Sequence, residues 1–259
     1  MFIFVWKKNK LIGIRGKNVA MKLRLVFGTM PLRRLTELSV AILLAFPIAV
    51  LLALLFVIVV PLQGRPFLYA SERMRGVGEP FFLFKIRTMH PPDAVSDQCV
   101  LGGDNAARVT GIGRFLRKTR LDELPQIFNV IRGDMSFIGP RPPLRRYVEA
   151  YPALYADVLQ DRPGITGLAT VMLHRREEQL LAACETAHET DQTYRQKCIA
   201  PKARLDRFYR TNRSLGMDLW ILWLTISRVI PRVPAAFRQD LATSRRRDRG
   251  ELGILIRDA

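Results

Sequence analysis

Cysteine and histidine are scarce in this chain, with three of each among 259 residues. The cysteines are Cys99, Cys184 and Cys198, and none belongs to a CxxC pair. This excludes a disulfide-stabilised scaffold and a cysteine-rich zinc site. The histidines lie far apart along the sequence, so neither a histidine metal centre nor a histidine-based catalytic triad is indicated.

Acidic residues are also few. The chain has 23 Asp and Glu against 41 Lys and Arg, which gives a formal net charge of +18. Such an excess implies an anionic partner, and nucleic acid, phospholipid and a phosphorylated substrate all satisfy it. The hydrophobic content of 49% excludes an intrinsically disordered chain, and the length allows one large domain or two small ones.

An uncharged and almost wholly apolar run occupies residues 38–64. As one helix it would be about 40 Å long, which exceeds the roughly 30 Å hydrocarbon core of a bilayer. The run begins too late for a signal peptide and ends without a small-x-small cleavage site. A buried core helix is the alternative, but a domain of this size rarely hides so long an apolar helix. We therefore predict a membrane-embedded helix.

Pro47 lies inside this run and is expected to kink or break the helix. Basic residues flank the run on both sides, whereas the positive-inside rule assigns only one flank to the cytoplasm. A re-entrant helix that breaks at Pro47 and returns to the same face resolves this conflict. A proline kink in an ordinary spanning helix is the alternative, and these residues alone leave both open.

After the apolar run the composition becomes that of a basic globular domain. Strands are predicted at 66–69 and 81–88, and helices at 112–119, 123–132, 144–159, 175–187 and 191–211. The apolar stretch 215–237 carries Trp220 and Trp223, and either lies in the membrane interface or packs on the protein core. The predicted fold class is α/β in the α+β sense and mostly helical. It has an N-terminal re-entrant helix broken at Pro47, a small β-hairpin and several amphipathic interfacial helices.

The densest group of candidate catalytic residues lies in segment 113–126, GRFLRKTRLDELPQ. Asp122 and Glu123 precede Pro125, which suits the first turn of a helix, so both carboxylates are predicted at a helix N-terminus. The helix dipole favours their ionised forms there by about 0.3–1 kcal/mol. An N-capping aspartate with an acidic first turn is the favoured explanation of the pair taken alone.

Basic side chains around the pair favour a catalytic role, because capping requires no cations. Arg141 lies between prolines in GPRPP, and Arg162 precedes a turn in RPGITG, so each has a stiff backbone that loses little entropy on binding. Guanidinium groups match phosphate oxygens bidentately. Carboxylates among arginines, with Mg²⁺, suit phosphoryl transfer. The basic residues of this region are Arg114, Arg117, Lys118, Arg120, Arg132 and Arg141.

Three motifs together resemble the bacterial sugar transferases, the monotopic phosphoglycosyl transferases that act on polyprenol phosphate. They are KIRTM at 85–89, GRFLRKTRLDELPQIFNVIRGDMSFIGPRPP at 113–143 and RPGITG at 162–167. The resemblance covers about residues 33–232 and is very specific in the central block. It implies transfer of sugar-1-phosphate from a UDP-sugar to polyprenol (undecaprenyl) phosphate, with release of UMP. It also implies action at the cytoplasmic face of the bacterial inner membrane, in contact with its lipids, as the initiating step of glycan assembly.

The resemblance also implies roles for individual residues. Asp122 is expected to be the nucleophile that forms a phosphosugar–aspartyl intermediate, with Mg²⁺ held by Asp122 and Glu123. The predicted substrate-binding residues are Lys85, Arg87, Arg117, Arg141 and Arg162. The re-entrant helix of the family favours a break at Pro47 over a simple kink.

Two departures from the family pattern limit what can be carried over. The family usually has serine before the proline of the helix break, whereas Phe46 stands here. After RPGITG the chain continues with Leu168-Ala169-Thr170 where many relatives have Trp-Ala-Gln, so the sugar cannot be inferred.

Four segments are predicted: a basic extension at 1–32, the membrane helix at 33–64, the catalytic domain at 65–237 and a basic tail at 238–259. The first 32 residues lie outside the resemblance, and Met21 or Met30 is an alternative start. A membrane-tethered nucleic-acid-binding protein is the alternative function. No nucleic-acid partner is expected, because the aromatic residues are not interleaved with Lys and Arg as stacking platforms.

Overall fold

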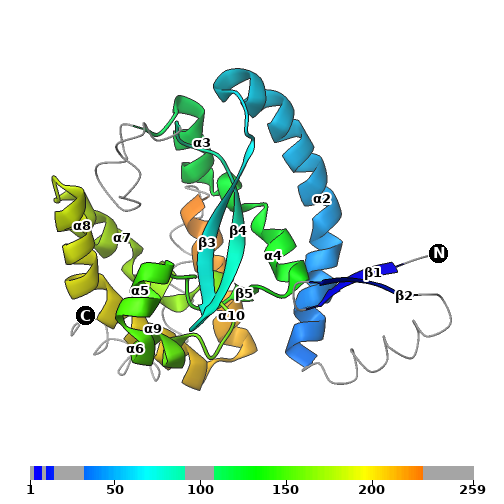
Figure 1. Cartoon of the computed structure of the whole chain (residues 1–259). Coiled ribbons are helices and arrows are strands. Elements are labelled where there is room, and N and C mark those ends of the chain that lie inside the picture. Colours follow the sequence, from blue (N-terminus) through cyan, green and yellow to red (C-terminus); the bar gives the residue numbers. More distant parts are fainter. Residues whose placement is uncertain (1–2, 8–9, 15–31, 91–107, 230–259) are drawn as a thin grey trace, which may run out of the picture. The chain divides into compact units, whose positions relative to one another are not determined.

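The computed structural model describes residues 3–7, 10–14, 32–90 and 108–229 (Figure 1). The chain divides into two units, residues 1–44 and 45–259, and the division falls within one long helix. In the first unit, β1 (Ile3–Lys7) pairs antiparallel with β2 (Lys10–Ile14). This hairpin was not predicted from the sequence.

Helix α2 (Leu32–Gln63) is the long apolar helix that the sequence predicts. It runs through Pro47 without interruption, so it does not divide there into two shorter helices. A long helix can absorb a proline as a local kink, because only one hydrogen bond and one turn are affected. The predicted re-entrant course stays a prediction.

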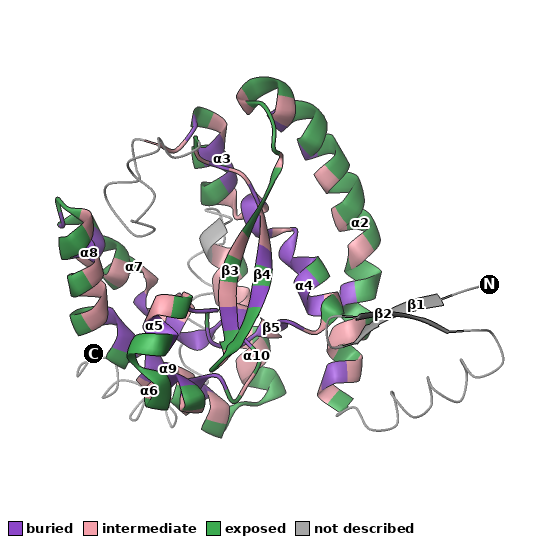
Figure 2. Ribbon diagram, viewed as in Figure 1, coloured by how far each residue is buried: buried purple, intermediate pink, exposed green. Residues whose placement is uncertain are grey.

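The surface of α2 is apolar and largely exposed (Figure 2). Only 11% of its most apolar 18-residue window is buried, and side chains such as Leu43, Phe46 and Val57 are more than two-thirds exposed. Among the described residues it is the one helix long and apolar enough to cross a membrane. An exposed apolar surface of this length is unfavourable in water, so lipid is the environment that suits it.

The second unit combines a β-hairpin, a short parallel strand pair and many helices (Figure 1). The hairpin is formed by β3 (Leu68–Gly76) and β4 (Glu79–Ile86), and β5 (Ser136–Ile138) pairs in parallel with β6 (Gly164–Thr166). The remaining elements are α3 (Gly111–Thr119), the 3-10 turn η2 (Leu121–Glu123), α4 (Gln126–Arg132), α5 (Arg145–Ala150), α6 (Pro152–Val158), α7 (Leu168–Ala182), α8 (Ala187–Thr193), the π-helical turn η3 (Tyr194–Cys198), α9 (Ile199–Asn212) and α10 (Leu215–Val229). The mostly helical α+β class with a small hairpin is therefore confirmed.

Several boundaries differ from the predicted ones for local reasons. The predicted helix 144–159 is two helices, because Pro152 has no amide hydrogen to donate and begins α6 after the irregular residue Tyr151. Strand β3 extends to Gly76, far beyond the predicted end at residue 69, because it pairs with β4 along its length. The predicted helix 191–211 is interrupted by the π-helical turn η3.

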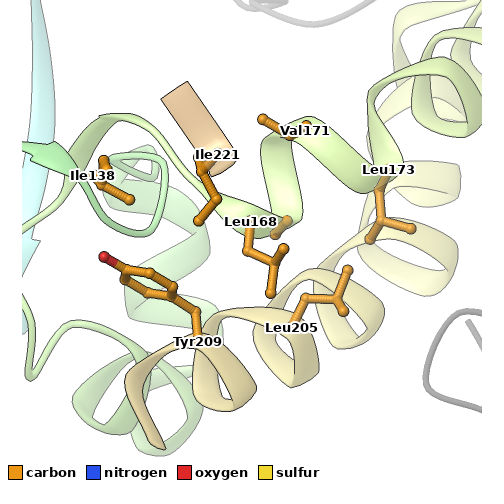
Figure 3. Packing of buried hydrophobic residues seen from close by; sticks show 8 residues of the cluster. Ile138, Leu168, Val171, Leu173, Leu205, Tyr209 and Ile221 are labelled. Atoms are coloured by element: carbon orange, nitrogen blue, oxygen red, sulfur yellow. The ribbon is translucent and has the colours of Figure 1, made fainter. Parts of the chain in front are cut away.

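The main core of the second unit forms where α7, α9 and α10 meet. Leu168, Leu205 and Ile221, one from each helix, are almost fully buried and converge beside Tyr209 (Figure 3). Leu215 and Leu219 of α10 remain exposed. One face of the stretch 215–229 therefore packs on the core, which was one of the two predicted alternatives. The exposed apolar side chains leave the other alternative, a position in the membrane interface, open. Residues 230–237 of this predicted helix lie outside the described residues.

Two further clusters attach the hairpin to its surroundings. Met74 of β3 packs with Tyr147, Tyr155 and other residues of α5, α6 and α9. Leu55 and Val59 of α2 pack with Ile86 of β4 and Leu116 of α3. The C-terminal part of α2 is thereby joined to the hairpin and to the helix that precedes the carboxylate pair.

The GPRPP and RPGITG motifs meet at the β5–β6 pair, and glycine is required at the contact. A Cβ atom on Gly164 would lie 2.1 Å from the amide nitrogen of Gly139. A Cβ atom on Gly167 would lie 2.1 Å from the carbonyl oxygen of Gly139. No side chain tolerates such distances. The two motifs are thus held backbone against backbone, which fixes the start of the loop that carries Arg141.

Candidate active site

The carboxylate pair lies on the 3-10 turn η2, between α3 and α4. Arg120 reverses the chain after α3 with a φ of 60°, a left-handed conformation that is unusual for a residue with a side chain. The sequence predicted the pair in the first turn of the following helix. In the structure Pro125 is the N-cap of α4, so the pair precedes that helix. Asp122 and Glu123 are only 7% and 8% exposed.

Glu123 is surrounded by three cations. Its Oε1 accepts hydrogen bonds from Nζ of Lys85 at 3.4 Å and from Nη2 of Arg141 at 3.5 Å, and its Oε2 accepts one from Nη1 of Arg120 at 3.1 Å. Burial alone would raise the pKa of Glu123, but the charges of Arg141, Lys85 and Arg120 outweigh it and bring the pKa to about 2. Glu123 is therefore ionised throughout the physiological range.

Asp122 has a different environment. Within the described part of the chain its carboxylate forms no hydrogen bond and no ion pair within 4 Å. Burial and the neighbouring negative charge of Glu123 raise its pKa, although Lys85, Arg117 and Arg120 oppose the shift. The adjacent carboxylates thus have separate properties: Glu123 is held by cations, whereas Asp122 remains available to a ligand.

Lys85 reaches the pair because the hairpin is fixed to α4. The side-chain amide of Asn129 donates to the carbonyl of Phe82 at 2.7 Å and accepts from the amide of Phe84 at 3.2 Å. Asn129 is fully buried, so both bonds are shielded from water. Lys85 follows on the same strand, and burial lowers its pKa while the charge of Glu123 opposes that shift.

Arg117 and Arg141 lie near the pair, as predicted. Arg117 is oriented by a 2.8 Å hydrogen bond from its Nε to Oγ1 of Thr88, and its charge acts on Asp122. Arg141 contacts Glu123, whose charge raises the pKa of the guanidinium, and its side chain remains 44% exposed. An arginine held on one side and open on the other is suited to receive an anion.

The structure does not bring Arg87 or Arg162 to the pair. The guanidinium of Arg87 donates to the carbonyls of Gln63 and Gly64, where α2 ends. Arg162 is exposed ahead of β6. Their predicted substrate-binding roles remain predictions, and the position of Arg87 assigns it a structural role in joining α2 to β4.

A small hollow lies beside the pair. It is lined by Arg73, Leu83, Lys85, Gln126, Arg141, Pro142, Gly164 and Ile165. Arg73 was not predicted from the sequence, because it lies outside the matched motifs and between the predicted strands 66–69 and 81–88. Had the long hairpin been predicted, its register would have placed Arg73 on the same face as Lys85.

A Mg²⁺ site was predicted at Asp122 and Glu123. No group of three or more His, Cys, Asp or Glu side chains that could hold a metal is found among the described residues. Mg²⁺ commonly binds through one or two carboxylates together with substrate phosphates. The buried carboxylate of Asp122, raised in pKa and without a partner in the described part, fits such an ion.

Comparison with known proteins agrees with the resemblance found in the sequence. The family model described as "Bacterial sugar transferase" matches residues 28–232. A UDP-glucose:undecaprenyl-phosphate glucose-1-phosphate transferase of Caulobacter vibrioides is 36% identical over 184 residues, which cover 68% of this chain and 59% of that protein. An uncharacterized sugar transferase of Bacillus subtilis is 34% identical over 201 residues, which cover 78% of this chain and 88% of that protein.

An undecaprenyl-phosphate galactose phosphotransferase of Salmonella typhimurium is 34% identical over 184 residues, which cover 66% of this chain and 34% of that protein. The chain therefore spans only about a third to three-fifths of the Salmonella and Caulobacter relatives, although it spans most of the Bacillus one. None of these matches supports the nucleic-acid-binding alternative. The chain belongs to the bacterial sugar transferase family.

Proposed function

We propose that this protein transfers sugar-1-phosphate from a UDP-sugar to polyprenol phosphate at the membrane, with release of UMP. The observation that carries the proposal is the carboxylate of Asp122, which is buried, lacks a partner among the described residues and stands among Lys85, Arg117 and Arg120. The Caulobacter and Salmonella relatives are named for transfers to undecaprenyl phosphate, which supports this class of reaction.

The first half-reaction follows from the positions of the charged groups. Lys85, Arg117 and Arg141 bind the diphosphate and screen its negative charge, which would otherwise repel a carboxylate. Asp122 then attacks the phosphorus next to the sugar, and the bond from that phosphorus to the bridging oxygen breaks. UMP leaves with the electron pair of that bond, and the sugar phosphate remains on Asp122.

The second half-reaction regenerates the enzyme. An oxygen of polyprenol phosphate attacks the same phosphorus, and the carboxylate of Asp122 leaves with its electrons. Arg87 ties the end of α2 to strand β4, two residues beyond Lys85. A lipid in the bilayer around α2 can thus present its phosphate near the site. Mg²⁺ held by Asp122 and Glu123 would supply further charge screening at the phosphates.

The test is a nucleotide-release screen. Purified protein is mixed with a panel of UDP-sugars, polyprenol phosphate and Mg²⁺, and UMP is measured. UMP release from at least one UDP-sugar that depends on the lipid for repeated turnover is expected. Absence of release across the panel, with binding of nucleic acid that weakens in salt, would favour the alternative function instead.

Arg141 provides a sharper test of phosphate binding. Lysine keeps the charge but loses the planar fork that grips two oxygens. Arg141→Lys is expected to lower kcat/KM by about tenfold or more, which corresponds to about 1.4 kcal/mol. Steady-state UMP release measures the effect, with Arg145→Lys as the control, because Arg145 pairs with Glu72 at the surface. Kinetics equal to wild type in Arg141→Lys would remove Arg141 from the phosphate site.

We further propose that α2 bends at Pro47 within the bacterial inner membrane and returns to the same face, so that the N-terminal segment and the catalytic domain both face the cytoplasm. Its exposed apolar surface and the basic residues on both flanks support this course. Single cysteines placed near residues 25 and 240, in a background without native cysteines, should react with an impermeant reagent only after the membrane is opened. Labelling of the early site in intact spheroplasts would establish a spanning helix.

A further inference from the structure

Arg73 lies on the face of the hairpin that borders the hollow beside the carboxylate pair. In the β3–β4 register Arg73 is opposite Phe81, Ser71 opposite Leu83 and Tyr69 opposite Lys85. Residues two apart along a strand share a face, so Arg73, Leu83 and Lys85 point to the same side. All three line the hollow, together with Arg141 from the GPRPP loop.

The charge of Arg73 is not balanced by the described residues around it. No carboxylate among them lies within 4 Å of its guanidinium, and its one hydrogen bond is a long one of 3.4 Å to Oγ of Ser71. Burial and the positive charge of Arg141 lower the pKa of Arg73 to about 10. A partly buried cation beside another cation is unfavourable unless an anion joins them.

Arginines of the same hairpin and its neighbour α5 that serve structural roles do have acidic partners. Arg75, two residues further along β3, pairs with Glu79 at 3.0 Å and with Asp134 at 3.6 Å. Arg145 of α5 forms a bidentate pair with Glu72, with contacts of 2.7 and 3.0 Å. The absence of an acidic partner within the described residues therefore distinguishes Arg73 from these neighbours.

We propose that Arg73 binds a substrate phosphate, which occupies the hollow between Arg73, Lys85 and Arg141. The arrangement offers two guanidinium groups and an ammonium group around one space. Among the described residues, Glu123 is the carboxylate in ion-pair contact with both Lys85 and Arg141. Phosphate oxygens match guanidinium donors in charge and geometry. This phosphate belongs either to the nucleotide-sugar or to the lipid acceptor. These two candidates are the substrates of the proposed function, on which the inference rests.

The experiment compares Arg73→Gln and Arg73→Lys with Arg75→Gln, a control on the same strand. UMP release in a single turnover without lipid gives the apparent affinity for the UDP-sugar, and steady-state turnover gives the KM for polyprenol phosphate. Arg73→Gln should raise one of these values about tenfold or more, with Arg73→Lys intermediate. A weaker apparent affinity for the UDP-sugar identifies the nucleotide-sugar as the source of the phosphate. A change confined to the KM for polyprenol phosphate identifies the lipid.

Thermal unfolding with inorganic phosphate as the probe supplies a readout that does not depend on turnover. Phosphate should raise the Tm of the wild type and of Arg75→Gln, and this rise should be much smaller in Arg73→Gln. Without phosphate, Arg73→Gln should be at least as stable as wild type, because an unbalanced charge is removed. A structural role would instead lower its Tm.

The proposal is overturned if Arg73→Gln equals Arg75→Gln in both kinetic values and in the phosphate-dependent rise of Tm. A wild-type protein that releases no UMP from any UDP-sugar contradicts the proposed function. The thermal measurement then decides separately whether Arg73 forms an anion site.

Discussion

Asp122→Asn is expected to abolish both the burst of UMP and steady-state turnover. Asparagine has nearly the same shape and can occupy the same buried position, but its amide is a far poorer nucleophile toward phosphorus. If Asp122 carries the sugar phosphate, wild-type protein given UDP-sugar and Mg²⁺ without polyprenol phosphate should release up to one UMP per enzyme. The sugar phosphate should be found on the peptide that contains Asp122.

The control for this variant is Asp157→Asn. Asp157 lies outside the active site and pairs with Arg210 at 2.6 Å. It should retain the burst. A wild-type protein that releases UMP only when both substrates are present would exclude the covalent intermediate. Asp122 would then act in a direct transfer from the nucleotide-sugar to the lipid.

Asp122→Asn should also stabilise the protein while it removes activity. The folded-state pKa of Asp122 is raised, so its ionised form is disfavoured by folding, and stability is lost as the pH rises through that pKa. At neutral pH the asparagine variant avoids this loss, and its Tm should exceed that of wild type. For the same reason, the burst of the wild type should disappear on acidification at a higher pH than for an ordinary aspartate.

The parts of the site predictable from sequence are those carried by contiguous motifs. Asp122, Glu123 and Arg141 stand in an unbroken block of family sequence, and the apolar run of α2 needs only composition to be found. Both features can be found from neighbouring residues alone. In the structure the three side chains lie together, and the apolar run forms a helix. The sequence left a kink and a break at Pro47 both open, because the proline removes the same helical hydrogen bond in either case, and α2 continues through it.

The parts that sequence could not supply depend on pairing between distant segments. Charged residues in β3 hide its alternating pattern, so the strand was predicted to end early, and Arg73 was left between the two predicted strands. Arg87 belongs to a matched motif, yet its guanidinium serves the end of α2, which can be known only once that end is placed against β4. The opposite pKa shifts of Asp122 and Glu123 likewise depend on cations that come from separate elements of the fold.

Glu123→Gln is expected to have the opposite effect on stability from Asp122→Asn. The pKa of Glu123 is lowered from 4.5 to about 2 in the folded protein. A group with a lowered pKa contributes stability above its unfolded value, and this contribution is lost as the pH falls from about 4.5 through about 2. At neutral pH, removal of the charge should cost about 3 kcal/mol, since each pKa unit corresponds to about 1.4 kcal/mol.

The same change should also impair catalysis, because Lys85, Arg120 and Arg141 lose the anion that holds them together. Three cations left without that charge repel one another, so kcat/KM should fall by at least about tenfold. The matched control is Glu79→Gln, which breaks the exposed pair with Arg75 and should cost at most about 1 kcal/mol with normal activity. Thermal unfolding and UMP release on both variants measure the two effects. If Glu123→Gln is as stable and active as Glu79→Gln, Glu123 does not organise the cations, and the separate properties assigned to Asp122 and Glu123 are wrong.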